Sequence, residues 1–218
     1  MTPETRIRAG FALTLALFAA LAFFALKSGR AVYETGPAME VRAADGAVVF
    51  VWDKPVEAPM AYRFREAFKA ARSSAGRIVI LLNSPGGALT EGRSVIEEID
   101  RMKRTHHVET RVAAGSTCAS MCAPIFLAGE ERVAAPDARF MFHEPTSVDY
   151  FTEEKADKPA FEQRMDAERF FERYFERSPM DAAWREKLRQ AWKGQDVWKT
   201  GAELVAEGSN VVTRLDGS

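Results

Sequence analysis

The sequence is poor in cysteine and histidine, and no block of one charge sign occurs in it. Only two of its 218 residues are cysteines and three are histidines. Thirty basic residues stand against 31 acidic ones, for a net charge of −1. Because no basic stripe or patch is visible, we exclude nucleic acid as a partner. The pattern of a phosphate-binding loop, with its lysine, is missing as well. We expect no cofactor and no metal.

Charge is also absent from one long stretch near the N-terminus. The 18 residues from Ala9 to Leu26 are uncharged, which is just long enough for a tilted bilayer crossing. Two other interpretations fit the sequence less well. A buried core helix this uniformly apolar is not expected at the extreme N-terminus. A cleaved signal peptide would need a cleavage site of the form small-x-small, for which the sequence offers only poor candidates. The pattern therefore favours an N-terminal tail (1–8), a transmembrane signal-anchor (9–27), a linker (28–38) and one domain (39–218).

The orientation of this anchor follows from its short basic tail. Such a tail usually stays in the cytoplasm, although the basic residues on the two flanks nearly balance. We therefore predict a single-pass membrane protein with its domain on the extracytoplasmic, periplasmic side. A cysteine pair is free to oxidise there.

Apolar segments alternate between two periods along the rest of the chain. Helical stripes separate runs that are typical of strands, which predicts an α/β fold with parallel pairing. A long amphipathic helix over 159–178 carries aromatic residues along one side, and it either docks on the sheet or forms a subunit contact. The predicted strands are AVVFVW (47–52), RIVILLN (77–83), VETRVAAG (108–115) and ARFMF (138–142), and a helix is expected around Ser120.

Three short segments could carry chemistry together. NSPGG (83–87) follows a buried strand and opens a helix, so its backbone N–H groups are exposed, although alone it is only a tight turn. Ser120 lies midway between Cys118 and Cys122, and His143 comes directly after a strand. A serine hydroxyl needs a base, the base needs a carboxylate, and the attacked carbonyl needs N–H donors. The chain offers each of these components in an order that could be assembled.

The same segments resemble a known family. NSPGGALTEG, TRVAAGSTCASMCAPIFLAG and AAPDARFMFHEP closely resemble the proteolytic subunit of the Clp protease, over about residues 47–146. The resemblance implies the Clp/crotonase fold, a repeated β-β-α superhelix with a mostly parallel sheet. It also implies a serine peptidase that hydrolyses peptide or unfolded protein substrates and forms a homo-oligomer.

Carried over position by position, the resemblance assigns roles to single residues. It makes Ser120 the nucleophile and His143 the base, with the backbone N–H groups of Gly87 and Met121 as oxyanion donors. Asp196, in QDVWKTGAELVAEGSNVV (195–212), matches the third member. On order alone, the other two candidates for that role are Asp149 and Asp181.

Several features depart from the family pattern. Glu144 stands where the soluble family often has glutamine, and the spacing between serine and histidine looks slightly short. The flanking cysteines and the N-terminal apolar segment are both foreign to the soluble protease. They indicate a membrane-anchored or exported branch.

Three other functions were weighed against the peptidase. A non-catalytic member of the same fold would bind or act as a scaffold at the membrane. A crotonase-type acyl-CoA enzyme would have no reason for a Ser–His pair, and a Ser–Lys peptidase would need a lysine near the site.

The two cysteines leave one question open. On a regular helix, residues four apart have Cβ atoms about 5–6 Å apart, whereas a disulfide prefers about 3.5–4.5 Å. The conflict eases if Cys118 lies in the turn before the helix, with Ser120 near its first turn. A bridge and two buried thiols used as packing are both compatible with the spacing.

Overall fold

The computed structural model describes residues 39–44, 46–146 and 159–217. The predicted tail, signal-anchor and linker fall outside the described residues, and so does Asp149. Within these described ranges, no helix has both the length and the apolar character needed to cross a membrane.

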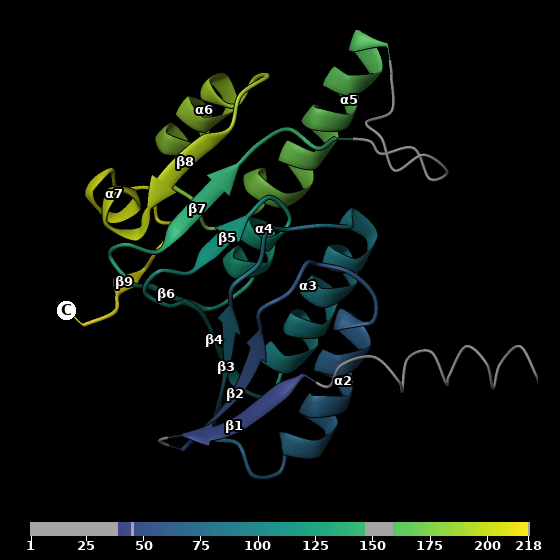
Figure 1. The fold of residues 1–218 in the computed structure, drawn as a ribbon, viewed down its shortest axis with the longest axis vertical. Coiled ribbons are helices and arrows are strands. Elements are labelled where there is room, and N and C mark those ends of the chain that lie inside the picture. The colour runs from purple at the N-terminus through teal and green to yellow at the C-terminus, as the bar shows by residue number, and fades with distance from the viewer. Residues whose placement is uncertain (1–38, 45, 147–158, 218) are drawn as a thin grey trace, which may run out of the picture. The chain divides into compact units, whose positions relative to one another are not determined.

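Nine strands and seven helical segments make up the described part of the chain (Figure 1). In chain order they are β1 (Glu40–Ala44), β2 (Ala47–Trp52), α2 (Met60–Ala71), β3 (Arg77–Leu82), α3 (Leu89–Lys103), β4 (His107–Val112), β5 (Thr117–Ala119), α4 (Cys122–Leu127), β6 (Glu131–Ala134), β7 (Arg139–Phe142), α5 (Ala160–Phe171), the π-helical η1 (Glu172–Glu176), α6 (Ala182–Ala191), β8 (Val197–Thr200), α7 (Gly201–Ala206) and β9 (Arg214–Leu215).

The strands form two sheets. The larger has the order β1-β2-β3-β4-β6-β9, and all its pairs are parallel except β1 with β2. The smaller has the order β5-β7-β8, in which β5 and β7 are parallel and β7 and β8 antiparallel. The expected α/β fold with a mostly parallel sheet is therefore confirmed, whereas β1, β5, β6, β8 and β9 were not predicted.

One structural unit recurs along the chain. It consists of a strand of the large sheet, then a short strand of the small sheet, then a helix. β4, β5 and α4 form one such unit, and β6, β7 and α5 form the next. In the two preceding units a single parallel bridge takes the place of the small strand, Ser84 to Cys118 after β3 and Val56 to Gly87 after β2. This is the repeated β-β-α arrangement that the resemblance implied.

The helices bury most of their predicted apolar faces, with exceptions at their ends. α2 and α3 lie along one face of the large sheet (Figure 1) and bury Phe64 and Ile99 completely. Leu89, Phe161 and Met165, by contrast, are 40%, 56% and 46% exposed. Each lies in the first two turns of its helix.

An aromatic cluster supports the strand that leads to His143. The helix predicted over 159–178 ends its α-helical part at Phe171 and continues as the π-turn η1. Phe175 of η1 and Trp184 of α6 both pack edge-on against Phe142, the last residue of β7. All three side chains are at most 5% exposed.

Candidate active site

Ser120 lies in a left-handed turn between a strand and a helix. β5 ends at Ala119 and α4 begins at Cys122, so the helix predicted around Ser120 begins two residues after it. The φ angle of Ser120 is 53°, a region that non-glycine residues seldom adopt and that costs on the order of 1–2 kcal/mol. Its N–H donates to the carbonyl of Met141 at 2.9 Å, and its carbonyl accepts from the N–H of Ala123 at 3.0 Å. The turn is thereby held from both sides.

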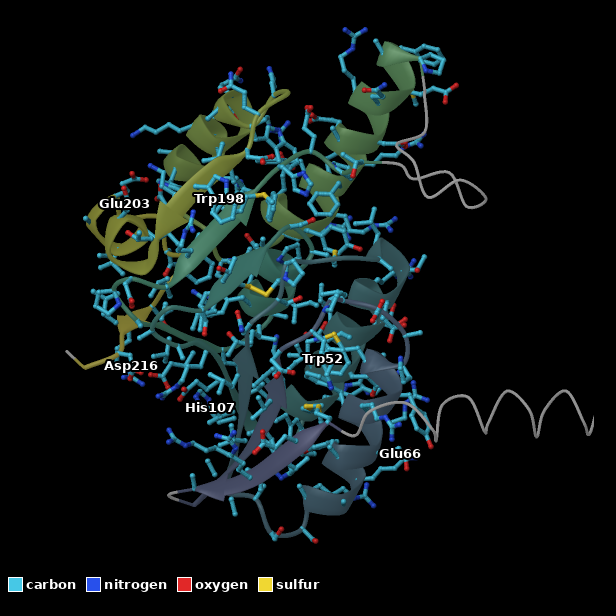
Figure 2. The ribbon with its side chains drawn as sticks, in the orientation of Figure 1. Trp52, Glu66, His107, Trp198, Glu203 and Asp216 are labelled. Carbon is cyan, nitrogen blue, oxygen red and sulfur yellow. A yellow bond between two sulfur atoms is a disulfide. The ribbon has the colours of Figure 1, made fainter. Side chains whose placement is uncertain are left out.

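A disulfide joins the two ends of this turn. Cys118 of β5 is bonded to Cys122 at the start of α4, with 5.1 Å between their Cα atoms (Figure 2). That separation lies within the range that disulfides use, and Cys118 is in a strand rather than in the helix. Both cysteines are fully buried. Ser120 therefore sits in a small covalent ring.

The NSPGG segment is attached to the Ser120 turn by backbone hydrogen bonds. The N–H of Ser84 donates to the carbonyl of Thr117 at 2.7 Å, and the N–H of Ala119 donates back to the carbonyl of Ser84 at 3.0 Å. Gly86 has a φ of +93°, and a Cβ atom added there would lie 2.5 Å from the Cβ of Ser120. Only glycine allows so close an approach of the two backbones.

Two backbone N–H groups beside Ser120 are available as donors. Val56 donates to the carbonyl of Gly86 and accepts from the N–H of Ala88, both at 2.7 Å, so the N–H of Gly87 points away from Val56. Met121 precedes the first residue of α4, where helices leave their N–H groups unpaired. In the part of the chain that the structure describes, neither Gly87 nor Met121 donates a backbone hydrogen bond.

His143 directly follows β7 and reaches the serine. Its Nε2 atom lies 2.7 Å from the Oγ atom of Ser120, a hydrogen-bond distance. Its side chain is 21% exposed. Burial lowers the pKa of the His143 imidazole, and the charge of Asp196 partly opposes this effect. The ring is therefore neutral near pH 7 and can accept the proton of the serine hydroxyl.

Asp196 comes to His143 through the antiparallel pairing of β7 with β8. Phe142 pairs with Val197, so one step further along the same register His143 stands opposite Asp196. The Asp196 Oδ1 atom lies 3.9 Å from the His143 Nδ1 atom, which is longer than a hydrogen bond, and the carboxylate is 58% exposed. The two side chains are therefore neighbours, but they do not form a hydrogen bond in this structure.

Two further contacts bear on the third member of the set. The carboxylate of Glu144 accepts a hydrogen bond from the N–H of Gly194 at 3.0 Å, which ties the chain after His143 to the turn before Asp196. Asp181 instead caps the N-terminus of α6 by accepting from the N–H of Trp184 at 2.9 Å. The structure thus places Asp196, not Asp181, beside the histidine.

The other two histidines lie elsewhere. The Nε2 atom of His106 is 2.9 Å from the carbonyl oxygen of Arg72, and its ring packs edge-on against Phe68. His107 is exposed. Among the described residues, no group of three or more histidine, cysteine, aspartate or glutamate side chains could hold a metal ion.

Sequence reasoning missed some residues that shape the site. Gly86 and Ser84 lie within the NSPGG motif, but their contacts with β5 appear only in three dimensions. The hydrogen bond between Glu144 and Gly194 has no local signal, because its partners are 50 residues apart.

Comparison with known proteins identifies the family and the fold of the chain. A family model described as Clp protease matches residues 47–168, more than half of the chain. Among solved structures, a point mutant of ClpP1 from Listeria monocytogenes is similar with a TM-score of 0.58 and 20% sequence identity. The match covers 78% of this chain and 91% of that chain. At this identity the structural likeness shows the fold alone.

Proposed function

We propose that this chain, which belongs to the Clp protease family, is a serine peptidase that hydrolyses peptide bonds through Ser120, His143 and Asp196. The observation that carries the proposal is the distance of 2.7 Å between the Ser120 Oγ and His143 Nε2 atoms. A hydrogen bond between a hydroxyl and a neutral imidazole is what a serine needs to become a nucleophile.

The acylation step uses the serine and the histidine together. The Oγ atom of Ser120 attacks the scissile carbonyl carbon while the Nε2 atom of His143 takes the hydroxyl proton. The carbonyl oxygen becomes an anion and accepts hydrogen bonds from the N–H groups of Gly87 and Met121. The tetrahedral adduct then collapses, His143 donates its proton to the leaving amine, and an acyl ester remains on Ser120.

Deacylation repeats these roles with water as the nucleophile. His143 takes a proton from the water as it attacks the acyl ester and returns it to the Oγ atom of Ser120. The N–H donors on Gly87 and Met121 are fixed by the backbone, so they need no rearrangement between the two steps.

Asp196 orients the imidazole and stabilises its charged form. At 3.9 Å from Nδ1 its carboxylate is close enough to favour the protonated ring, in agreement with the direction of its effect on the pKa of His143. Catalytic hydrogen bonds are often long without substrate and shorten when it binds. The hydrogen bond from Gly194 to Glu144 limits how far the Asp196 turn can move.

Covalent labelling tests the proposal directly. A general fluorophosphonate probe should label the full-length chain at Ser120, and Ser120→Ala should abolish both labelling and peptide hydrolysis. Ser116→Ala, in the loop that precedes β5, is the matched control and should behave as wild type. If the wild-type protein is not labelled while it is folded, the chain is a non-catalytic binding member of the family.

Residues 9–27 are proposed to anchor the protein in a membrane, with its catalytic domain on the extracytoplasmic side. The uncharged N-terminal run supports the anchor, and the disulfide supports an oxidising compartment. The full chain should stay with membranes after alkaline extraction, and external protease should reach the domain without detergent. Release of the chain into the soluble fraction would contradict the anchor.

A homo-oligomer is proposed for the same protein, on the family resemblance. Chains that are all anchored in one membrane by their N-termini cannot stack as two rings with those termini at opposite ends. We therefore expect a single ring or a smaller symmetric assembly. The mass of the complex in detergent measures this, and a double ring with intact N-termini from one membrane would contradict it.

A further inference from the structure

A pocket of about 360 Å³ has walls in three segments of the chain. The first is the start of α3, with Leu89, Thr90 and Arg93, and the second is Pro145 with Thr146. The third is α5 with η1, which contributes Asp166, Arg169, Phe170, Arg173 and Tyr174. The first two segments begin two residues after the proposed oxyanion donor Gly87 and two residues after the proposed base His143.

The lining carries an excess of positive charge. Among the described residues that line it, the charged ones are three arginines and one aspartate. Arg93 is paired with Glu97 at 3.0 Å, and Arg169 lies 3.8 Å from Asp166. Arg173, by contrast, has no carboxylate partner among the described residues. A guanidinium without a partner at the mouth of a pocket favours a carboxylate ligand.

Two stripes along one helical segment give the pocket a mixed chemistry. Arg169 and Arg173 are four residues apart, and so are Phe170 and Tyr174, whose ring centroids lie 4.8 Å apart. The charged stripe can bind a carboxylate while the aromatic stripe packs against methylene groups. Among amino-acid side chains, glutamate combines an aliphatic stem with a terminal carboxylate.

We infer that this pocket selects an acidic side chain, glutamate above all, at the substrate residue whose carbonyl is attacked. The inference rests on the proposed function, because it gives the peptidase a substrate class. The same backbone that presents the Gly87 N–H to the carbonyl continues into Leu89 and Thr90 on the pocket wall. The inference assigns the pocket to the side chain next to that carbonyl.

Peptidyl phosphonate probes test the selectivity without the need for turnover. We would label the full-length protein with probes that carry a glutamate, glutamine, leucine or lysine side chain next to phosphorus, and measure the second-order rate at Ser120. Glutamate and glutamine have nearly the same shape, so their ratio isolates the charge. Because the arginines are exposed, we expect a preference for glutamate of about fivefold, the upper end for an exposed ion pair. High salt should reduce it.

Substitutions assign the effect to Arg173. Arg173→Gln should bring the ratio of the glutamate rate to the glutamine rate close to one. Arg173→Glu should make the lysine probe faster than the glutamate probe. Arg177→Gln is the matched control, since Arg177 is an exposed arginine one turn further along that does not line this pocket.

The outcomes separate this inference from the proposed function. Absence of labelling with the general fluorophosphonate overturns the peptidase proposal itself. Labelling with that probe but equal rates for glutamate and glutamine overturns the selectivity alone. If Arg173→Gln left the ratio of the glutamate and glutamine rates unchanged, this pocket would not be the cause of the preference.

Discussion

A methyl group at Gly86 should disable the site while the fold persists. The Cβ atom of Gly86→Ala would lie 2.5 Å from the Cβ of Ser120, 2.6 Å from the carbonyl oxygen of Ala119 and 3.0 Å from the amide nitrogen of Met121. Two of these atoms belong to backbone, so they cannot rotate away. The nucleophile and one proposed oxyanion donor must therefore move relative to the NSPGG segment.

The size of that movement sets the expected loss. Ordinary contact begins at 3.4 Å, so a separation of 2.5 Å requires a shift of about 0.9 Å. A misplacement of about 1 Å can cost about 10²-fold in rate. Overpacking costs about 1–3 kcal/mol of stability, and a positive φ adds about 1–2 kcal/mol for alanine. We expect a loss of labelling and hydrolysis of about 10²-fold and a fall of about 2–5 kcal/mol in the free energy of unfolding.

Gly115→Ala separates the backbone cost from the steric cost. Gly115 has a φ of +70° and belongs to the loop before β5, but an added Cβ would have nothing within 4 Å. This variant should lose about 1–2 kcal/mol of stability and keep its rate of labelling. Urea unfolding and the rate of fluorophosphonate labelling would be measured on both variants. Wild-type labelling in Gly86→Ala would refute the proposed arrangement of the site.

Three further results are expected. The pKa of His143 is lowered, and the protonated ring cannot accept the serine proton, so kcat/KM should rise with pH with a midpoint below about 6.5. A midpoint above pH 7 would contradict this. Asp196→Asn should slow hydrolysis by several orders of magnitude, by analogy with about 10⁴ for a histidine held in the wrong tautomer, and it should lower the pH midpoint of kcat/KM. Asp181→Asn should change neither the rate nor the midpoint, because asparagine also caps helices. Replacement of both Cys118 and Cys122 by alanine should cost about 2 kcal/mol of stability, because the disulfide closes so small a ring. Labelling of Ser120 should fall while unfolding stays cooperative, and full labelling would show that the bridge does not position the serine.

The long apolar runs made much of the fold predictable. The strands β2 and β3 were predicted from AVVFVW and RIVILLN, because a strand covered on both faces must be apolar along its length. β5 and β9 were not predicted, since two or three residues are too short for a period and their pairing depends on distant strands. The helix predicted around Ser120 is present, but it begins only at Cys122. Small residues allow helix or turn, and tertiary hydrogen bonds decide between them.

The site was predictable where it lies in short motifs. Ser120 and His143 were predicted from their surroundings, and the structure places them within hydrogen-bond distance. Asp196 could not be separated from Asp181 by order alone, because the choice depends on the register of β7 with β8. The arginine-lined pocket gave no signal, since its walls come from three separate segments.

The pairing of β8 with β7 makes the proposed site depend on the C-terminal part of the chain. Ser120, His143 and the proposed oxyanion donors all lie within the first 143 residues, whereas Asp196 directly precedes β8. A chain cut before β8 would keep the proposed nucleophile and base but would lack the carboxylate beside the histidine, and it would also lack β9 of the large sheet. Under the proposed function, the last part of the chain to be synthesised therefore supplies both an edge of the fold and the group that orients His143.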